Sequence, residues 1–227
     1  MMLSLPVLLW VLAVVVESAP LLRARDSDLV ATRCPDFCAG TNSTKDETAS
    51  AYICGDPRLG PSVLPAGLPL EGIAGIDSTY HRFGGLCPGD FLAKWTNAST
   101  GQFVYPPHDG YALTAEGVPA MFNYTLEPGT YLDRFGSEYG AYMSPAGAAY
   151  AQRSLPPTNL AAAPGAMYPY NYRVYTVAKN LTVQGGAIAG WFGQQGLGLQ
   201  FLMPKNIMTL VNEGYLNRVN LTADPNW

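Results

Sequence analysis

The chain has 227 residues, of which 48% are hydrophobic and 13% are charged, about half the charged fraction of an ordinary soluble domain. This composition excludes a disordered, strongly solvated chain, and the net charge of −4 without any basic run excludes the positive surface that binding to nucleic acid requires. With 24 Gly and 19 Pro in no repeating period, the sequence predicts a loop-rich, mostly β protein of the α+β class.

An apolar run over residues 3–16 opens the chain. About 14 residues are too few to cross a hydrocarbon core of roughly 30 Å, but this length is typical of a signal peptide. We expect cleavage after Ser18, because cleavage after Ala19 would leave Pro20 at the new terminus. Residues 1–18 therefore predict a secreted, extracellular or cell-surface protein without a membrane span. The alternatives are a buried strand or an uncleaved anchor.

The next segment, residues 19–87, is rich in Gly, Pro, Cys and Asp and shows little periodicity, which predicts an extension packed on the rest of the chain. It holds four cysteines, namely Cys34, Cys38, Cys54 and Cys87. An even number of cysteines in an oxidising compartment indicates two disulfides, and the spacing leaves all three pairings open. A zinc site would need more converging ligands than one close pair of cysteines and two distant histidines.

Residues 88–227 show a more regular pattern. Residues 88–95 predict a short helix that Pro88 opens. Strands are predicted at residues 172–177, 181–191 and 199–203, where aromatic, β-branched and apolar residues gather. A second helix is predicted at residues 205–213, because apolar residues recur there at helical spacing and Gly214 stands at the position of a C-terminal cap.

Asparagine spacing supports secretion independently of the leader. Asn-x-Ser/Thr sequons occur at Asn42, Asn97, Asn123, Asn180 and Asn220. With 11 Asn and 26 Ser plus Thr in the chain, about one sequon is expected by chance. A glycan is bulky and must point to solvent, so we expect these five asparagines to be exposed.

Several polar residues lie in otherwise apolar, Gly-rich segments. Arg134 and Arg153 could together hold a diphosphate, because a guanidinium makes two parallel bonds to phosphate oxygens. The alternative is that each arginine pairs with a carboxylate, as Arg134 could with Asp133 or Glu138. The histidines lie near no Gly-x-Ser-x-Gly elbow, which argues against a serine triad. A carboxylate-based glycosidase stays open through Asp109, Asp133 and Glu138, although no spacing selects a pair.

These same segments resemble the tuberculosis necrotizing toxin (TNT) domain family, in particular secreted fungal NAD glycohydrolases. The ordered motifs are YPPHDGY (105–111), LEPGTYLDRFGSEYGAYMSPAG (126–147), AQRSLPP (151–157), AIAGWFGQQGLGLQFLMP (187–204) and LVNEGYL (210–216). The resemblance implies a TNT-like domain over residues 88–227, on a compact, mostly β fold related to ADP-ribosylating toxins. It also implies hydrolysis of the nicotinamide–ribose bond of NAD or NADP, with the dinucleotide as substrate and no cofactor for catalysis.

Site residues follow from the resemblance position by position. The family's Asp-Arg-Phe/Tyr-Gly motif falls on Arg134 and its Arg-Ser-Leu-Pro-Pro motif on Arg153, and both arginines suit the substrate's phosphates. Phe135 and Tyr142 are candidates for the nicotinamide side. The family's essential glutamine follows a Gly-Gly-Gly-x stretch, which implies Gln200 as first choice for the catalytic amide.

Gln194 is the second choice for that amide, and Leu197 replaces the middle glycine of the stretch. Transferases that modify proteins usually need a Glu-x-Glu pair, which LGLQFLMP lacks, so hydrolysis is favoured over transfer. The alternatives are an ADP-ribosyltransferase and a non-enzymatic extracellular binding or surface protein on the same fold. Related enzymes suggest a homodimer, and the tail offers one acid, Asp224, to a structural calcium ion; the sequence decides neither.

Overall fold

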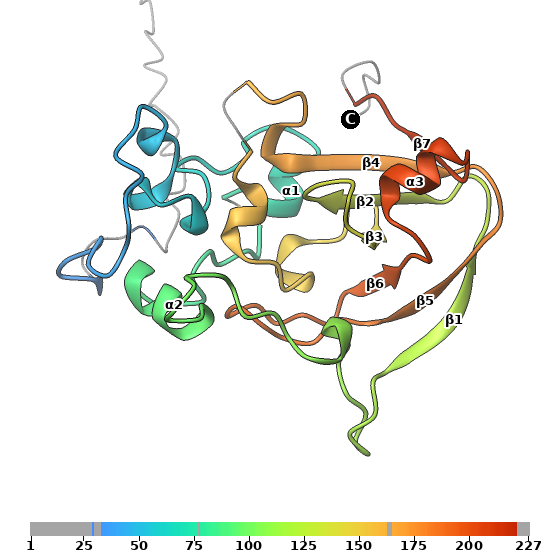
Figure 1. Cartoon of the computed structure of the whole chain (residues 1–227), viewed down its shortest axis with the longest axis horizontal. Helices are drawn as coiled ribbons and strands as arrows, with labels where there is room; N and C mark the ends of the chain where they lie inside the picture. Colours follow the sequence, from blue (N-terminus) through green and yellow to red (C-terminus); the bar gives the residue numbers. More distant parts are fainter. Residues whose placement is uncertain (1–28, 30–32, 77, 163–164, 222–227) are drawn as a thin grey trace, which may run out of the picture.

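The structure is a computed structural model that describes residues 29, 33–76, 78–162 and 165–221 (Figure 1). The predicted signal peptide lies outside these residues. The strands are β1 (Met121–Leu126), β2 (Tyr131–Phe135), β3 (Tyr142–Pro145), β4 (Tyr172–Val177), β5 (Leu181–Ala187), β6 (Leu199–Leu202) and β7 (Leu216–Arg218). The helices are α1 (Leu70–Ala74), α2 (Pro88–Trp95) and α3 (Ile207–Asn212), and short 3-10 turns fill much of the rest. The expected mostly β fold is confirmed.

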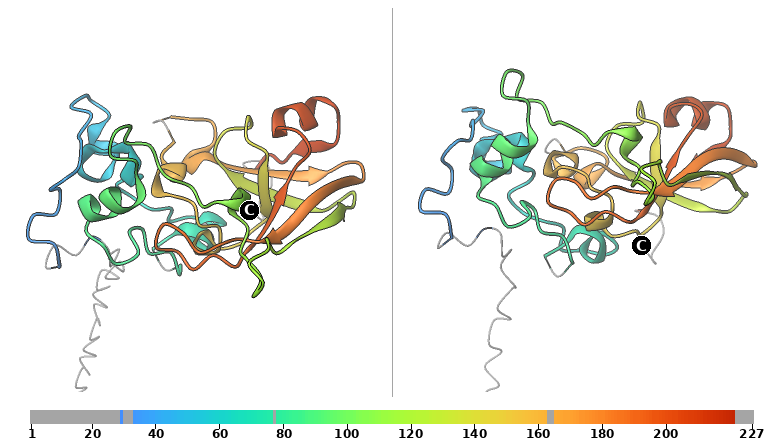
Figure 2. Two further views of the ribbon diagram at one scale, coloured as in Figure 1. Left: turned by 60° about the horizontal axis from the view of Figure 1, so that its bottom comes forward. Right: turned by 90° about the horizontal axis from the view of Figure 1, so that it is seen from below.

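The strands form a single antiparallel sheet in the order β1-β5-β6-β3-β2-β4-β7. The sheet is curved, and α3 lies beside it (Figure 1). Every strand contributes to one buried cluster, which Ile207 and Leu210 of α3 complete. Figure 2 shows the strands and α3 at one end of the molecule, with α2 and the first described part of the N-terminal extension, coloured blue, at the other. In the described part of the chain, no helix has both the length and the apolar character needed to span a membrane.

The predicted helices form where their caps place them. Helix α2 spans the expected residues, with Pro88 in its first turn and Phe91 and Leu92 buried. Helix α3 is shorter than expected, because Asn206 is its N-cap: its side chain accepts a hydrogen bond from the Thr209 N–H at 2.8 Å. Gly214 follows the helix with a φ of +71°, a conformation that favours glycine.

Strand β5 ends at Ala187, so the prediction that it runs to residue 191 is wrong. Phe192 has a φ of +52° and turns the chain away from the ladder. Its ring is fully buried beside Phe91 of α2, together with Leu59 and Phe83 of the extension. The apolar run thus serves packing against α2 instead of continuing the strand.

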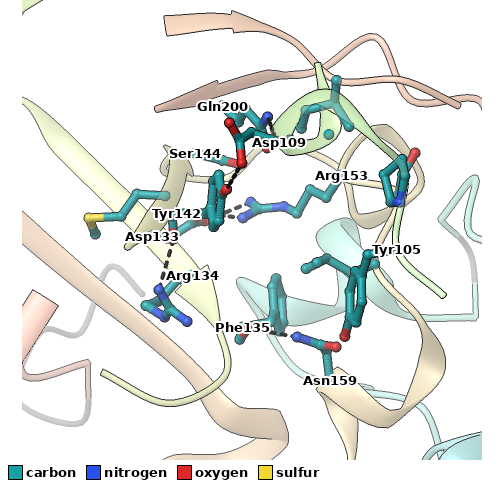
Figure 3. Close-up of a pocket in the computed structure, with 16 residues that line it drawn as sticks. Tyr105, Asp109, Asp133, Arg134, Phe135, Tyr142, Ser144, Arg153, Asn159 and Gln200 are labelled. Carbon is teal, nitrogen blue, oxygen red and sulfur yellow. Dashed lines mark hydrogen bonds and ion pairs between the residues drawn. The ribbon is translucent and has the colours of Figure 1, made fainter. Parts of the chain in front are cut away.

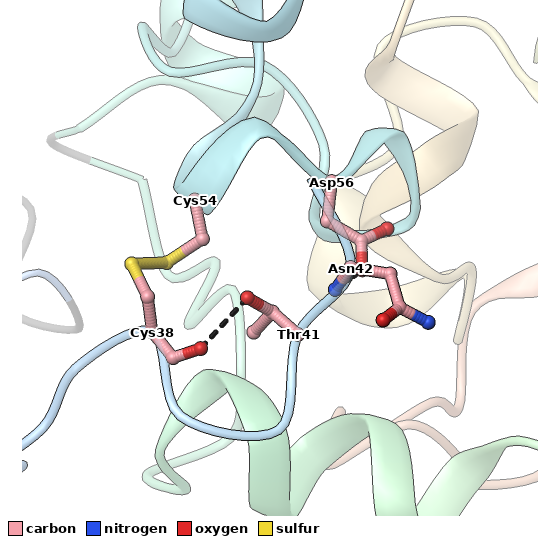
Figure 4. The surroundings of a disulfide bond; sticks show 5 residues. All are labelled: Cys38, Thr41, Asn42, Cys54 and Asp56. Carbon is pink, nitrogen blue, oxygen red and sulfur yellow. Dashed lines mark hydrogen bonds between the residues drawn. A yellow bond between two sulfur atoms is a disulfide. The ribbon is translucent and has the colours of Figure 1, made fainter. Parts of the chain in front are cut away.

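The N-terminal extension is fastened by two disulfides, as expected, and their pairing is Cys34–Cys87 and Cys38–Cys54. Figure 4 shows the second of them. Beside the second one, Asp56 is almost fully buried and accepts bonds from Arg58 and from the backbone N–H of Asn42. The extension also shares buried apolar clusters with α2 and with β2 and β4, so its stability is coupled to that of the sheet.

Replacing both Cys38 and Cys54 with Ala is expected to lower the free energy of unfolding. The bridge closes a loop with a sequence separation of 16 residues, and removing the constraint from the unfolded chain corresponds to about 3 kcal/mol. Urea denaturation of the double variant beside the wild type measures the difference. A loss below about 1 kcal/mol would contradict the prediction.

Glu138 links the sheet to its last strand. Its carboxylate accepts bonds from Nε and Nη2 of Arg218 at 2.7 and 2.6 Å and from the hydroxyl of Tyr175 at 2.7 Å. The bonds from Arg218 lower the pKa of Glu138, while partial burial opposes this effect. Because the folded-state pKa is depressed, the contribution to stability is present above the unfolded-state pKa and is lost as the pH falls through the folded-state pKa.

Glu138→Gln is therefore expected to lower the free energy of unfolding at pH 7 by about 1 kcal/mol. The expected loss is small because Arg218 is partly exposed and solvent screens the ion pair. The difference from the wild type should shrink as the pH is lowered below the normal pKa of a glutamate. Denaturation midpoints of both proteins are measured between about pH 3 and pH 7, a range that includes the reference pKa of a glutamate. A difference that stays constant over this range would show that the charge of Glu138 contributes nothing.

Candidate active site

A cavity of about 500 Å³ opens where β2 and β3 separate. The segment 105–110, strands β2 and β3, residues 153–159 and Gln200 of β6 line it (Figure 3). The cavity brings together Arg134, Phe135, Tyr142 and Arg153 with Gln200, residues that lie up to 66 positions apart in the sequence. Five of the six expected catalytic and substrate-binding residues thus line one cavity; Gln194 does not.

Arg153 is held by a carboxylate inside this cavity wall. Its Nη1 and Nη2 donate to the two carboxylate oxygens of Asp133, and its Nε and Nη2 donate to the carbonyl of Ala148. Asp133, fully buried, also accepts from the Gly147 N–H and the Tyr172 hydroxyl. The pairing that the sequence offered as an alternative for an arginine therefore occurs at Arg153, and most of its donors are engaged.

Arg134 is in a different electrostatic position. Its Nη1 donates to the carbonyl of Tyr142 at 2.9 Å, and its Nε is buried with no hydrogen-bond partner in the part of the chain that the structure describes. Burial lowers the pKa of Arg134, and the nearby Arg173 cation acts in the same direction. Among the described residues no carboxylate forms an ion pair with Arg134, so this guanidinium has donors available to an anion.

Gln200 has a fixed orientation. Its side chain is 8% exposed, and its Nε2 donates to the backbone carbonyl of Asp109 at 2.9 Å. A carbonyl accepts but does not donate, so this bond assigns the nitrogen of the amide and leaves Oε1 as an acceptor. The side chain is therefore set to receive a hydrogen bond from a hydroxyl or a water in the cavity.

Gln194 lies elsewhere. It is also buried, but its Nε2 donates to the carbonyls of His81 and Phe192, and it fixes a loop next to the extension. Leu197, where the related stretch carries glycine, has a φ of +64° and a side chain that is 73% exposed. The leucine thus keeps the left-handed backbone that favours glycine, and its side chain does not line the cavity.

The two aromatic candidates differ in exposure. Phe135 is 2% exposed and packs against Tyr150 and Tyr172, with the Arg153 guanidinium 5.1 Å from its ring centre. Tyr142 is 40% exposed, and its hydroxyl donates to Oδ1 of Asp109 at 3.2 Å. Burial, together with the charge of Asp109, raises the pKa of Tyr142 to about 12, so this hydroxyl stays protonated at neutral pH.

Sequence reasoning did not assign Tyr105 or Asn159 to the site, although both line the cavity. Asn159 donates from Nδ2 to the carbonyl of Phe135 at 3.1 Å, and Tyr105 packs edge-on against Phe192. Tyr105 is part of the YPPHDGY motif, and Asn159 lies in a Pro-rich turn. Neither residue stands in a periodic sequence pattern that would indicate a place in the site. Only the tertiary structure brings them to the cavity.

The structure also shows the surroundings of the three carboxylates that left a carboxylate-based glycosidase as an alternative. Asp133 and Glu138 are engaged by Arg153 and Arg218, and Asp109 alone of the three is exposed to solvent at the cavity. Within the described residues, no group of three or more His, Cys, Asp or Glu side chains could hold a metal ion. Asp224, the expected acid for a calcium ion, lies outside the described residues.

Arg153→Ala is expected to act mainly on stability. Breaking a buried ion pair leaves an unpaired charge and typically destabilises by about 3 to 5 kcal/mol, because Asp133 would lose the partner of both its oxygens. Urea denaturation of Arg153→Ala, of Asp133→Ala and of the double variant measures the coupling. A folded Arg153→Ala protein with unchanged stability would contradict this structural role.

Comparisons with known proteins extend these observations. The family model described as "Tuberculosis necrotizing toxin" matches residues 125–219, which contain all the expected catalytic and substrate-binding residues. The conidial surface nicotinamide adenine dinucleotide glycohydrolase nadA of Aspergillus fumigatus is 48% identical over 202 residues, covering 88% of this chain and 83% of that protein.

Among solved structures, the tuberculosis necrotizing toxin in complex with its immunity factor aligns with a TM-score of 0.46 and 17% identity, covering 79% of this chain and 90% of that one. The relationship rests on the identity with the Aspergillus protein over most of both chains and on the family match over residues 125–219. The chain belongs to the tuberculosis necrotizing toxin domain family, together with the Aspergillus NAD glycohydrolase to which it is 48% identical.

Proposed function

We propose that the protein is an NAD glycohydrolase, which cleaves the bond between nicotinamide and ribose to give nicotinamide and ADP-ribose. The observation that carries the proposal is the 48% identity, over 88% of the chain, to a protein named for this activity. The cavity supports it, because an arginine with donors available to an anion and an oriented amide line the same cavity. NADP carries the same scissile bond and belongs to the proposal as a second substrate.

Arg134 is the proposed contact for the diphosphate. Its buried Nε is without a partner in the described structure, and a phosphate oxygen would satisfy that donor while its negative charge offsets the guanidinium. Arg153, the other arginine that the resemblance implied, supports the substrate's phosphates less directly, because its engaged donors hold β2 through Asp133.

Gln200 is the proposed catalytic amide, with Gln194 as second candidate. As the bond breaks, its electron pair neutralises the nicotinamide ring and positive charge develops on the ribose, so the leaving group requires no general acid. Oε1 of Gln200 can accept a hydrogen bond from a ribose hydroxyl or from the attacking water and fix its position. Tyr142 and Phe135 are proposed to border the nicotinamide side of the cavity.

Product analysis tests the function directly. Purified protein is incubated with NAD+ and, in parallel, with NADP+, and the products are separated by chromatography. We expect nicotinamide and the ADP-ribose product in equal amounts. Label from adenine-labelled NAD+ that stays on a protein acceptor would indicate a transferase, and binding without turnover would indicate a non-enzymatic surface protein.

The proposal includes a location outside the cell or at its surface, and the name of the Aspergillus relative places that protein at the conidial surface. All five sequon asparagines are exposed, as a residue that carries a glycan has to be; they are Asn42, Asn97, Asn123, Asn180 and Asn220. We infer that they carry N-glycans, that the leader is removed after Ser18, and that a glycan-free face is available to a second copy. Mass analysis before and after glycan removal, with light scattering, tests these three points.

A further inference from the structure

The cavity contains an acid to which no role has been assigned. Two carboxylates line it, Asp133 and Asp109. Asp133 is saturated by Arg153, Tyr172 and the Gly147 N–H. The carboxylate of Asp109 receives one hydrogen bond in the described structure, from the Tyr142 hydroxyl, and is exposed to solvent at the cavity. Its negative charge is therefore available to a ligand.

Asp109 is held in place by the groups around it. Its φ is +54°, and its backbone carbonyl receives the Gln200 amide at 2.9 Å. Figure 3 shows Asp109 and Gln200 on one side of the cavity and Arg134 on the other. Tyr142 separates the two charges, since its hydroxyl donates to Asp109 and its carbonyl accepts from Arg134. The cavity thus has an anionic and a cationic end.

We propose that Asp109 is the anionic group that faces the nicotinamide ribose, and that it makes the site select the oxidised dinucleotide NAD+ over NADH. This inference rests on the proposed function. NAD+ carries a positive nicotinamide ring and a negative diphosphate with one ribose between them, which matches the order of Asp109 and Arg134. The reduced nicotinamide ring of NADH is neutral and lacks the charge that Asp109 attracts.

The same carboxylate serves the reaction. When the bond between ribose C1′ and the ring nitrogen breaks, the electron pair passes to the nitrogen, and the positive charge moves from the ring to the ribose. Asp109 stabilises this charge at both stages, as an anion does in glycoside cleavage. The water oxygen then bonds to C1′, and the proton that it loses passes to the solvent beside the exposed Asp109.

Asp109→Asn isolates the charge. Asparagine keeps the volume, accepts from the Tyr142 hydroxyl, tolerates a positive φ, and leaves the backbone carbonyl that anchors Gln200. We expect kcat for NAD+ to fall about ten- to a hundredfold at an unchanged melting temperature, less than for a fully buried group because solvent screens the charge. Glu116→Gln, which removes an equal charge from an exposed loop outside the cavity lining, should stay within about twofold of wild type.

A second measurement needs no variant. In the wild type, we expect the inhibition constant of NADH to exceed the KM of NAD+ by about fivefold or more, and in Asp109→Asn we expect the two constants to come within about twofold. A fall in kcat of less than about threefold in a folded Asp109→Asn protein, or equal affinity of the wild type for NADH and NAD+, would overturn the inference.

Failure of the proposed function would look different. It would appear as a wild type that releases no nicotinamide at all. Titration calorimetry of wild type and Asp109→Asn with NAD+ and NADH would then still decide whether Asp109 selects the positive ring, because that readout requires binding and no turnover. An active wild type with an equally active Asp109→Asn contradicts only the role of Asp109.

Discussion

Gln200→Ala is expected to reduce kcat for NAD+ hydrolysis about a hundred- to a thousandfold, with the melting temperature and KM little changed. Removing one positioned hydrogen-bonding group at a developing charge corresponds to about 3 to 4 kcal/mol of activation free energy. Gln200 fits this description because it is 8% exposed, lines the cavity, and is oriented by the Asp109 carbonyl, which leaves Oε1 as an acceptor. Steady-state kinetics with thermal melts give both quantities.

Gln194→Ala is the matched control. It removes an equally buried glutamine whose hydrogen bonds go to the carbonyls of His81 and Phe192, outside the cavity lining. We expect a lower melting temperature than for Gln200→Ala, because Gln194 loses two hydrogen bonds and Gln200 one, and a kcat within a fewfold of wild type. An active Gln200→Ala protein together with an inactive, folded Gln194→Ala protein would move the catalytic amide to Gln194.

Arg134→Lys is expected to be nearly as damaging as Arg134→Ala, with kcat/KM lower by about a hundredfold or more. A lysine ammonium cannot make two parallel bonds to a phosphate, and charge-assisted hydrogen bonds each contribute roughly 1.5 to 3 kcal/mol. Gly140 makes room for the Arg134 guanidinium, because a Cβ at position 140 would clash with its Nη2. Kinetics at several NAD+ concentrations separate the loss of affinity from that of turnover.

Arg218→Lys provides the comparison for Arg134→Lys. Arg218 also belongs to the sheet and is also a guanidinium, but it pairs with Glu138 and does not line the cavity. We expect a small loss of stability and unchanged kcat/KM. If Arg134→Lys turns over NAD+ like the wild type while remaining folded, the diphosphate does not depend on Arg134, and Arg153 becomes the arginine to test.

The elements with strong local signals were predicted from the sequence. Helix α2 and strand β4 have the expected bounds, because a proline at the first helical turn and an aromatic, β-branched alternation each act over a few residues. Strand β1 gave no such signal, since all but its last residue are exposed and its pattern is not that of a half-buried strand. The end of β5 depended on where Phe192 is buried, which is a tertiary property.

The candidate site was also predicted only in part. Motifs pointed to Arg134, Arg153 and Gln200, but they did not indicate which groups these side chains contact. The partner of Arg153 is Asp133, 20 residues away, and the residue that orients Gln200 is Asp109, 91 residues away. The disulfide pairing also required the fold, because spacing permits three arrangements of the cysteines. Such long-range contacts are set by sheet topology and leave no local pattern.

A crystal structure of Gln200→Ala with intact NAD+ bound tests most directly that this cavity is where the dinucleotide is cleaved. The variant should bind substrate without consuming it. The expected structure has a diphosphate oxygen bonded to the Arg134 guanidinium and the nicotinamide ribose between Asp109 and position 200. A dinucleotide bound outside the cavity would contradict the proposed site. A diphosphate that contacts Arg153 inside the cavity, in place of Arg134, would contradict only the role proposed for Arg134.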